Sequence, residues 1–231
     1  VFCHAAELET TRKPLAALGG TYYAIQSDGG LLAWGDSFHG AICADEDLPS
    51  FSRANRILEN AVFAAGNLNL GLAIDREQTL WGWGWDWTGR LLGAGDAGKT
   101  PVRLLDHAAA ADAGLHHCLA LKADGTVWSW GSNQYGQLGT GGREPERGRP
   151  PAHGPAQVMD HARAIATDGL SASFAVKEDG TVWAWGKQND GDAVWDTPRP
   201  ILDHVQEVRW TQSGGRGGIL LLGNDGTLWR S

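Results

Sequence analysis

The sequence predicts an all-β chain built from five copies of one strand–turn–strand unit. Two observations indicate this fold class. One short sequence motif, which ends in the pattern Asp-Gly-Thr-Val-Trp-x-Trp-Gly, occurs almost identically at residues 119–131 and 174–186. Weaker copies cover 23–35 and 72–84, and a fifth runs from 221 to 231. The copies return about every 50 residues, and such a fixed period is typical of repeat architectures.

Each copy predicts two antiparallel strands joined by a tight turn. Asp124-Gly125 and its equivalents lie between apolar runs, which indicates a type I′ turn with positive φ at both central residues. The second copy has other residues at 77–78, so its turn is expected to differ. Trp128 and Trp130 are two residues apart and therefore lie on one strand face. The predicted hairpin cores are 22–35, 70–84, 117–131, 172–186 and 218–231.

A second sequence motif recurs with the same period. It ends in Asp-His at residues 106–107, 160–161 and 203–204, and a weaker copy covers residues 54–61. Because a carboxylate can satisfy the N–H groups of a turn, these pairs are predicted to be structural. His107 and the run 116–118, which reads His-His-Cys, resemble a metal cluster. Adjacent strand residues point to opposite faces, however, so no metal site is predicted.

Composition bounds the possible partners. The chain has 231 residues and a net charge of −8, with no long basic run. It is expected to form one soluble domain over 1–231, without a nucleic-acid footprint. No apolar stretch approaches the ~20 residues of a membrane span, and no signal peptide is visible. The start at Val1 leaves room for an upstream segment, so the compartment stays open.

The three cysteines do not make a disulfide framework. Cys118 falls within a predicted strand and is expected to be a small buried apolar residue. Cys3 and Cys43 are interpreted as free thiols, and a bond between them in an oxidising compartment is the alternative.

Two sequence patterns suggest catalysis but are rejected. Residues 93–100 match the phosphate-loop pattern, yet Pro101 follows directly and disfavours the helix that such a loop needs. Residues 169–173 break the nucleophile-elbow pattern at its last position. The chain is therefore not expected to be an enzyme, and no cofactor is predicted.

The full line in the third copy continues with Asn133, Gly136, Gln137, Leu138 and Gly139. With these residues the repeat resembles the regulator of chromosome condensation repeat family, over nearly the whole chain. The resemblance implies a β-propeller of four-stranded antiparallel blades, and most well-known members have seven.

Five hairpins predict about five blades. The last copy stops before its second Trp, so the N-terminal segment would have to complete the fifth blade. The alternative is that the chain is a fragment of a seven-bladed propeller. Closure at five is favoured slightly, because the tryptophans of the repeat need burial.

The candidate binding residues are aromatic and cationic side chains that the repeat itself does not require. They are Trp85, Trp87, Arg90, Tyr135, Trp195 and Trp210. Exposed Trp, Tyr and Arg are typical anchors of protein interfaces. A protein-binding scaffold that uses loops on one face is therefore predicted, with an unidentified protein as partner. A carbohydrate- or ligand-binding propeller is the alternative. Guanine-nucleotide exchange on a small GTPase, an activity of the founding members of the family, ranks lower.

Overall fold

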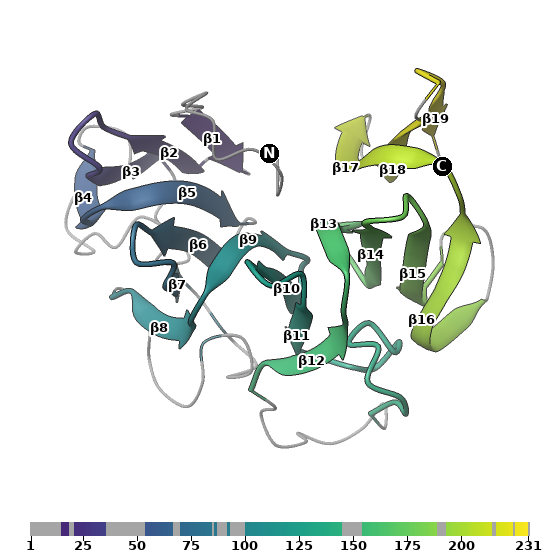
Figure 1. Ribbon diagram of the computed structural model, residues 1–231. Coiled ribbons are helices and arrows are strands. Elements are labelled where there is room, and N and C mark those ends of the chain that lie inside the picture. Colours follow the sequence, from purple (N-terminus) through teal and green to yellow (C-terminus); the bar gives the residue numbers. More distant parts are fainter. Residues whose placement is uncertain are drawn as a thin grey trace.

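The computed structural model describes residues 15–18, 21–35, 54–66, 70–84, 86, 92, 100–144, 154–188, 193–213, 216–223 and 225–230. Its strands form five antiparallel sheets, and the sheets follow one another along an arc in chain order (Figure 1). The all-β class and the β-propeller architecture predicted from the sequence are confirmed. The described residues form no helix that is long and apolar enough to cross a membrane.

The first four sheets each contain four strands, and the fifth contains three described strands. Their bounds, sheet by sheet, are β1 (Leu15–Leu18), β2 (Thr21–Ile25), β3 (Leu31–Gly35) and β4 (Asn55–Leu58); β5 (Ala61–Gly66), β6 (Leu70–Asp75), β7 (Leu80–Gly84) and β8 (Val102–Leu105); β9 (Ala108–Ala113), β10 (His117–Lys122), β11 (Val127–Gly131) and β12 (Ala156–Met159); β13 (Ala162–Thr167), β14 (Ala172–Lys177), β15 (Val182–Lys187) and β16 (Val194–Leu202); and β17 (Val205–Ser213), β18 (Arg216–Gly223) and β19 (Leu228–Arg230).

The hairpin turns use the Asp-Gly pair differently from the prediction. In the turn of the third sheet Gly125 has positive φ and Asp124 does not, and the N–H of Gly125 donates to the carbonyl of Lys122 at 3.0 Å. Asp124 accepts hydrogen bonds from the N–H and the hydroxyl of Thr126, at 3.0 and 2.7 Å. The type I′ prediction is therefore wrong. Because the Asp side chain already caps the turn, only the glycine adopts the left-handed conformation.

The residues that join one sheet to the next also lock the two sheets together. His161 connects β12 to β13 with a φ of 54°, and its carbonyl accepts the N–H of Glu178 at 2.9 Å. The N–H of Ala162 donates to the carbonyl of Gly125, also at 2.9 Å. Equivalent positive-φ residues follow β4, β8 and β16, namely Asn60, His107 and His204.

Two of the acids beside these histidines, Asp106 and Asp160, contact cations. Arg103 donates to Asp106 at 2.6 and 2.9 Å, and Lys177 lies 3.7 Å from Asp160. The periodic Asp-His pairs thus serve the sheet-to-sheet connection through the left-handed backbone of the histidine.

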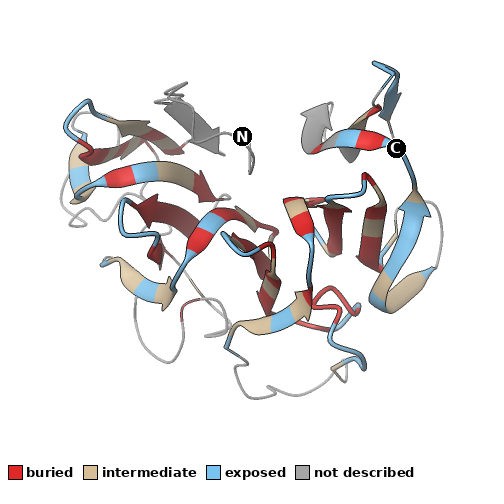
Figure 2. Ribbon diagram, in the orientation of Figure 1, coloured by how far each residue is buried: buried red, intermediate tan, exposed pale blue. Residues whose placement is uncertain are grey.

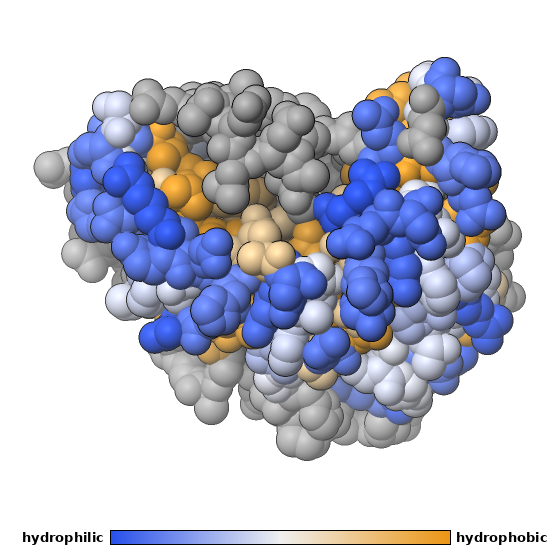
Figure 3. All heavy atoms as spheres, viewed as in Figure 1, coloured by the Kyte–Doolittle hydropathy of each residue, from blue (hydrophilic) through white to orange (hydrophobic). Residues whose placement is uncertain are grey.

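The core lies between neighbouring sheets. Trp83, Trp130 and Trp185 are fully buried, and each packs against residues of the preceding sheet. Trp128 joins the same cluster as Trp130, as the shared strand face predicts. In Figure 2 the burial is concentrated on the inner strands, whereas β8, β12 and β16 are mostly half-buried or exposed. Figure 3 shows hydrophilic side chains in a broad band around an apolar middle on one face.

The two ends of the arc lie in different sheets. Within the described residues, β1 pairs with β2, and the fifth sheet contains β17, β18 and β19. A closed five-bladed ring and a larger propeller both remain predictions.

Candidate functional site

Two of the six candidate residues are described with their side chains. Tyr135 lies in the loop between β11 and β12, and Trp195 lies at the start of β16. Trp210 lies on β17, where it is paired with Ile219 of β18, but its side chain lies outside the described residues. Trp85, Trp87 and Arg90 lie outside them as well, as do residues 93–99 of the rejected phosphate-loop pattern.

The loop over residues 132–144 is held in shape by its own amide side chain. Asn133 accepts the N–H of Leu138 at 3.0 Å and donates to the carbonyl of Gly142 at 3.1 Å. The hydroxyl of Ser129 on β11 donates to the carbonyl of Leu138 at 2.7 Å. Since a single side chain ties two points of the loop together, Tyr135 is presented from a constrained backbone.

The same loop lies directly on the neighbouring sheet. A Cβ built on Gly136 would lie 2.7 Å from the Cα of Asp196 and 2.9 Å from the carbonyl oxygen of Trp195. Gly141 donates its N–H to the carbonyl of Asp196 at 2.9 Å. Only a glycine permits this approach, so the loop that carries Tyr135 lies directly against the backbone of β16.

A buried polar network anchors this contact from below. The carbonyl of Gln137 accepts the hydroxyl of Ser173 and the indole N–H of Trp185, both at 2.9 Å. His117 Nε2 lies 2.8 Å from the same hydroxyl oxygen, so it donates there. Burial, with a smaller effect of His116, lowers the pKa of His117 to about 3. The imidazole is therefore neutral at physiological pH, and the loop is fixed by uncharged hydrogen bonds.

Exposed apolar and cationic side chains gather above this network. Tyr135 is 41% exposed and Leu170 is 54% exposed. The Nζ of Lys187 lies 5.5 Å from the ring centre of Tyr135. Lys187 also donates its backbone N–H to Ser171, the neighbour of Leu170, at 3.1 Å.

Arg143 reaches the strand pair that contains Lys187, because it donates to the carbonyl of Val194, the residue paired with Lys187, at 3.1 Å. We name this patch the Tyr135 surface; its members are Tyr135, Arg143, Leu170 and Lys187. The half-buried Trp195 lies outside it, since its ring packs in the cluster between the fourth and fifth sheets, 5.6 Å from the guanidinium of Arg199.

The Tyr135 surface carries two exposed cations, Arg143 and Lys187. Neither forms an ion pair with a carboxylate of a described residue. At the opposite end of the strands the hairpin turns carry exposed acids, among them Asp124, Asp179 and Asp225. Hydrogen bonds from the following threonine hold the pKa of these three carboxyls below the usual value.

Sequence reasoning missed three members of the surface, namely Arg143, Leu170 and Lys187. Lys187 had a usable signal, because it follows the Trp-Gly pair where other copies have Trp85 and Ser132. The other two are ordinary loop residues in the sequence, and only the contact between sheets groups them.

Metal-ligating side chains do not gather elsewhere in the part of the chain that the structure describes. No group of three or more His, Cys, Asp or Glu there could hold a metal ion. Cys118 is buried, and its burial raises the pKa of the thiol well above the ordinary value.

Comparison with known families supports the repeat. A family model described as the regulator of chromosome condensation (RCC1) repeat matches residues 124–165, and a second model of the same description matches residues 109–137. No curated protein matches the sequence.

Solved structures share the fold at low sequence identity. One is Prp20p from Saccharomyces cerevisiae, reported with its binding properties to Gsp1p and histones. It has a TM-score of 0.74 and 22% identity, with coverage of 94% of this chain and 56% of that chain. Human WBSCR16 has a TM-score of 0.71 and 18% identity, with coverage of 94% and 60%. The chain thus spans little more than half the length of these two proteins.

Proposed function

We propose that this chain, which belongs among the proteins with regulator of chromosome condensation repeats, binds another protein through the Tyr135 surface. The observation that carries the proposal is the exposed Tyr135, which a constrained loop presents where the third sheet lies against the fourth. The proposed role is one of binding rather than catalysis.

The shape of the surface suits a protein partner. Interface anchors are enriched in Tyr, Trp and Arg, and they work best when the backbone beneath them is already ordered. Here the side chain of Asn133 and the carbonyl of Gln137 hold the loop before any partner arrives. Tyr135 can therefore be buried by a partner without the cost of ordering its loop.

A relative offers independent support. The Prp20p structure was reported with binding properties to Gsp1p and histones, and another structure shows Kap60 bound to yeast RCC1 (Prp20). Both describe a propeller of this type in contact with proteins. Nucleotide exchange on a GTPase ranks lower as a proposal, because no residue of the Tyr135 surface points to it.

A carbohydrate-binding role has less support than a protein-binding one. A sugar platform needs an open aromatic face. The ring of Trp195 is half-buried, packs against the core between the fourth and fifth sheets, and lies beside the Arg199 guanidinium. Tyr135 is left as the one exposed ring of the surface.

The test is a quantitative co-purification from cells that express the protein. The tagged chain would be compared with a Tyr135→Ala/Leu170→Asp variant and with a Val62→Asp control, since Val62 is 51% exposed on β5 and outside the surface. We expect a discrete set of proteins to fall at least about tenfold with the first variant only, as for a truncated hot spot. Equal recovery with all three chains would contradict the proposal.

A further inference from the structure

We propose that the pair Asp225-Gly226 is a site of spontaneous covalent modification, at which the backbone isomerises through a cyclic imide to isoaspartate. The pair lies in the turn between β18 and β19 of the fifth sheet. The proposal concerns the chemistry of this turn, and it is independent of the Tyr135 surface and its partner.

The reaction needs only these two residues and water. The backbone nitrogen of Gly226 forms a bond to Cγ of Asp225, and the protonated carboxyl loses its hydroxyl, which leaves as water with the amide proton. One water then hydrolyses the imide at either of its two C–N bonds. Hydrolysis at the former backbone carbonyl leaves the chain linked through Cγ, which is isoaspartate. A glycine favours the first step, because it has no Cβ to shield its nitrogen.

The local sequence does not single out this pair. Asp-Gly also occurs at 28–29, 124–125, 168–169 and 179–180, and at 190–191 outside the described residues. The pairs that begin at Asp124, Asp179 and Asp225 are followed by the same residue type, threonine. In all three turns the carboxyl accepts the N–H of that threonine, at 3.0, 2.9 and 2.9 Å. A difference in reactivity between these three pairs must therefore come from the fold around each turn.

The turns of the earlier sheets are held by the sheet that follows. Each turn glycine accepts, at its carbonyl, the N–H of the first residue of the next sheet. The bonds run from Ala61 to Gly29 at 2.8 Å, from Ala162 to Gly125 at 2.9 Å and from Val205 to Gly180 at 3.0 Å. The backbone of a turn has to rotate before the glycine nitrogen can reach Cγ, and these bonds oppose that rotation.

The pair at 168–169 lies outside the hairpin turns but is held in the same way. The carbonyl of Gly169 accepts the N–H of Leu115 at 2.9 Å. The carboxyl of Asp168 is buried and accepts the N–H groups of Leu170 and Ala172, at 2.8 and 2.9 Å. Both halves of this pair are therefore fixed.

The glycine of the fifth turn is exposed, whereas its three equivalents are buried. Gly29, Gly125 and Gly180 are buried, and the next sheet lies within 4 Å of a Cβ built on each of them. Gly226 is exposed, and among the described residues nothing lies within 4 Å of such a Cβ. No described N–H donates to the carbonyl of Gly226. The turn is therefore free of the bond that holds the others.

The strand after this turn is also uncovered. Leu228 is 63% exposed, whereas the equivalent Val127 and Val182 are fully buried against the next sheet. Segments with few buried contacts open at a lower free energy than the rest of a protein. The turn at Asp225 can thus reach the reactive geometry without separating two sheets.

Peptide mapping of the aged full chain measures the reaction at each pair. Trypsin places the three Asp-Gly-Thr turns in separate peptides, because Lys122, Lys177 and Arg216 precede them. The folded protein is incubated near neutral pH and digested, and isoaspartate is quantified by electron-transfer fragmentation, which distinguishes it from aspartate. We expect it to form at least about tenfold faster at Asp225 than at Asp124 or Asp179, where a hydrogen bond and a buried apolar contact must be lost first.

Two variants assign the product to its residue. Asp225→Glu should abolish it, because the longer side chain does not favour a five-membered ring. Asp179→Glu, the matched control in the fourth sheet, should leave the product at position 225 unchanged.

The same incubation in urea is the control for local sequence. Once the chain is unfolded, the three rates should approach one another, because the turns share Asp-Gly-Thr. Equal rates in the folded protein, or a faster reaction at Asp124 or Asp179, would overturn the proposal. A preference for Asp225 that persists undiminished in urea would also overturn it, because neighbouring residues rather than the fold would then set the reactivity.

Discussion

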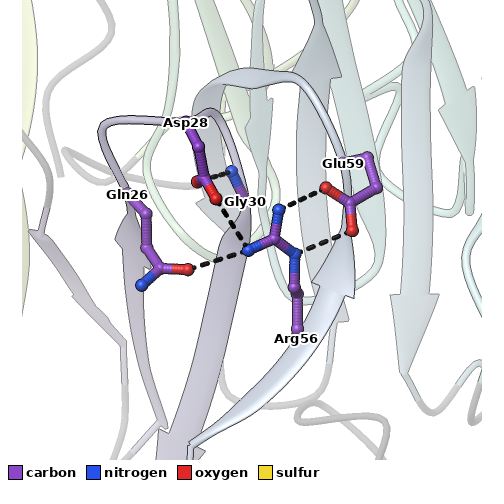
Figure 4. Close-up of polar contacts among 5 residues, drawn as sticks. All are labelled: Gln26, Asp28, Gly30, Arg56 and Glu59. Atoms are coloured by element: carbon purple, nitrogen blue, oxygen red, sulfur yellow. Dashed lines mark hydrogen bonds and ion pairs between the residues drawn. The ribbon is translucent and has the colours of Figure 1, made fainter.

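The guanidinium of Arg56 occupies the space that a side chain on Gly30 would need. A Cβ built on Gly30 would lie 2.4 Å from Cζ of Arg56. Arg56 extends from β4 to the turn between β2 and β3, where it donates to Asp28 at 3.0 Å and to Gln26 at 3.1 Å, and it pairs with Glu59 (Figure 4). Other copies of the repeat have threonine at the position of Gly30. The first sheet therefore replaces the threonine of the turn with an arginine from the next strand.

We expect Gly30→Ala to destabilise the wild type but to have almost no effect in an Arg56→Ala background. The new Cβ displaces the guanidinium and breaks its contacts with Asp28 and Glu59. A double-mutant cycle from urea unfolding measures this coupling. Additive effects of the two substitutions would show that Gly30 and Arg56 act independently.

Gly186→Ala should be much more harmful than Gly30→Ala. Gly186 has a φ of 86°, and a Cβ there would lie 2.1 Å from the carbonyl oxygen of Ser171. Backbone strain alone costs about 1–2 kcal/mol, and here the clash is with backbone rather than with a mobile side chain. Gly142→Ala is the matched control, because its φ of 74° is similar and nothing lies within 4 Å. Equal unfolding free energies for the two variants would contradict this account.

The histidines between sheets are predicted to act through their backbone. His161→Asn should leave stability unchanged, since Asn60 has the same role after β4 with a φ of 57°. His161→Val should cost about 1–2 kcal/mol, because a β-branched residue resists the left-handed region. Thermal unfolding of the three proteins, with and without added zinc, checks this. A zinc-dependent rise in Tm that His161→Asn abolishes would point to a ligand role instead.

His117 should make the protein less stable in acid. Its pKa is about 3 in the folded protein, whereas an exposed histidine titrates near 6.5. The unfolded chain therefore binds more protons between these values, so the stabilisation is complete above about pH 6.5 and is lost as pH falls toward 3. His117→Gln should flatten the dependence of the unfolding free energy on pH in this window. Burial also raises the pKa of Asp112 and Asp168. Both carboxyls are present in the wild type and in His117→Gln, so their contributions cancel when the pH dependence of the two proteins is compared. An unchanged slope would show that His117 is not the group that titrates.

The sheets could be predicted well from the sequence, because the pattern that specifies each strand lies within a few neighbouring residues. Trp128 and Trp130 share a face by strand geometry alone, and both pack against the preceding sheet. The turn type was missed because Asp124 caps Thr126 with its side chain, a choice that the Asp-Gly pair does not reveal.

The candidate site could be predicted only in part. Tyr135 stood out as an aromatic residue that the repeat does not require. Its place on the fourth sheet depends on Gly136 lying against the backbone of Trp195, a contact between residues far apart in the sequence. Lys187 and Arg143 are common surface residue types, and only this contact distinguishes them from other cations.

Site-specific photocrosslinking tests the central claim most directly. A benzoylphenylalanine in place of Tyr135 would be compared with one in place of Val62 in cells that express the protein, with Lys187→Glu as a second background. A discrete crosslinked protein should form from position 135, fade in the Lys187→Glu background, and be absent from position 62. The same product at both positions, or no product at position 135, would contradict the assignment of the Tyr135 surface as the binding site.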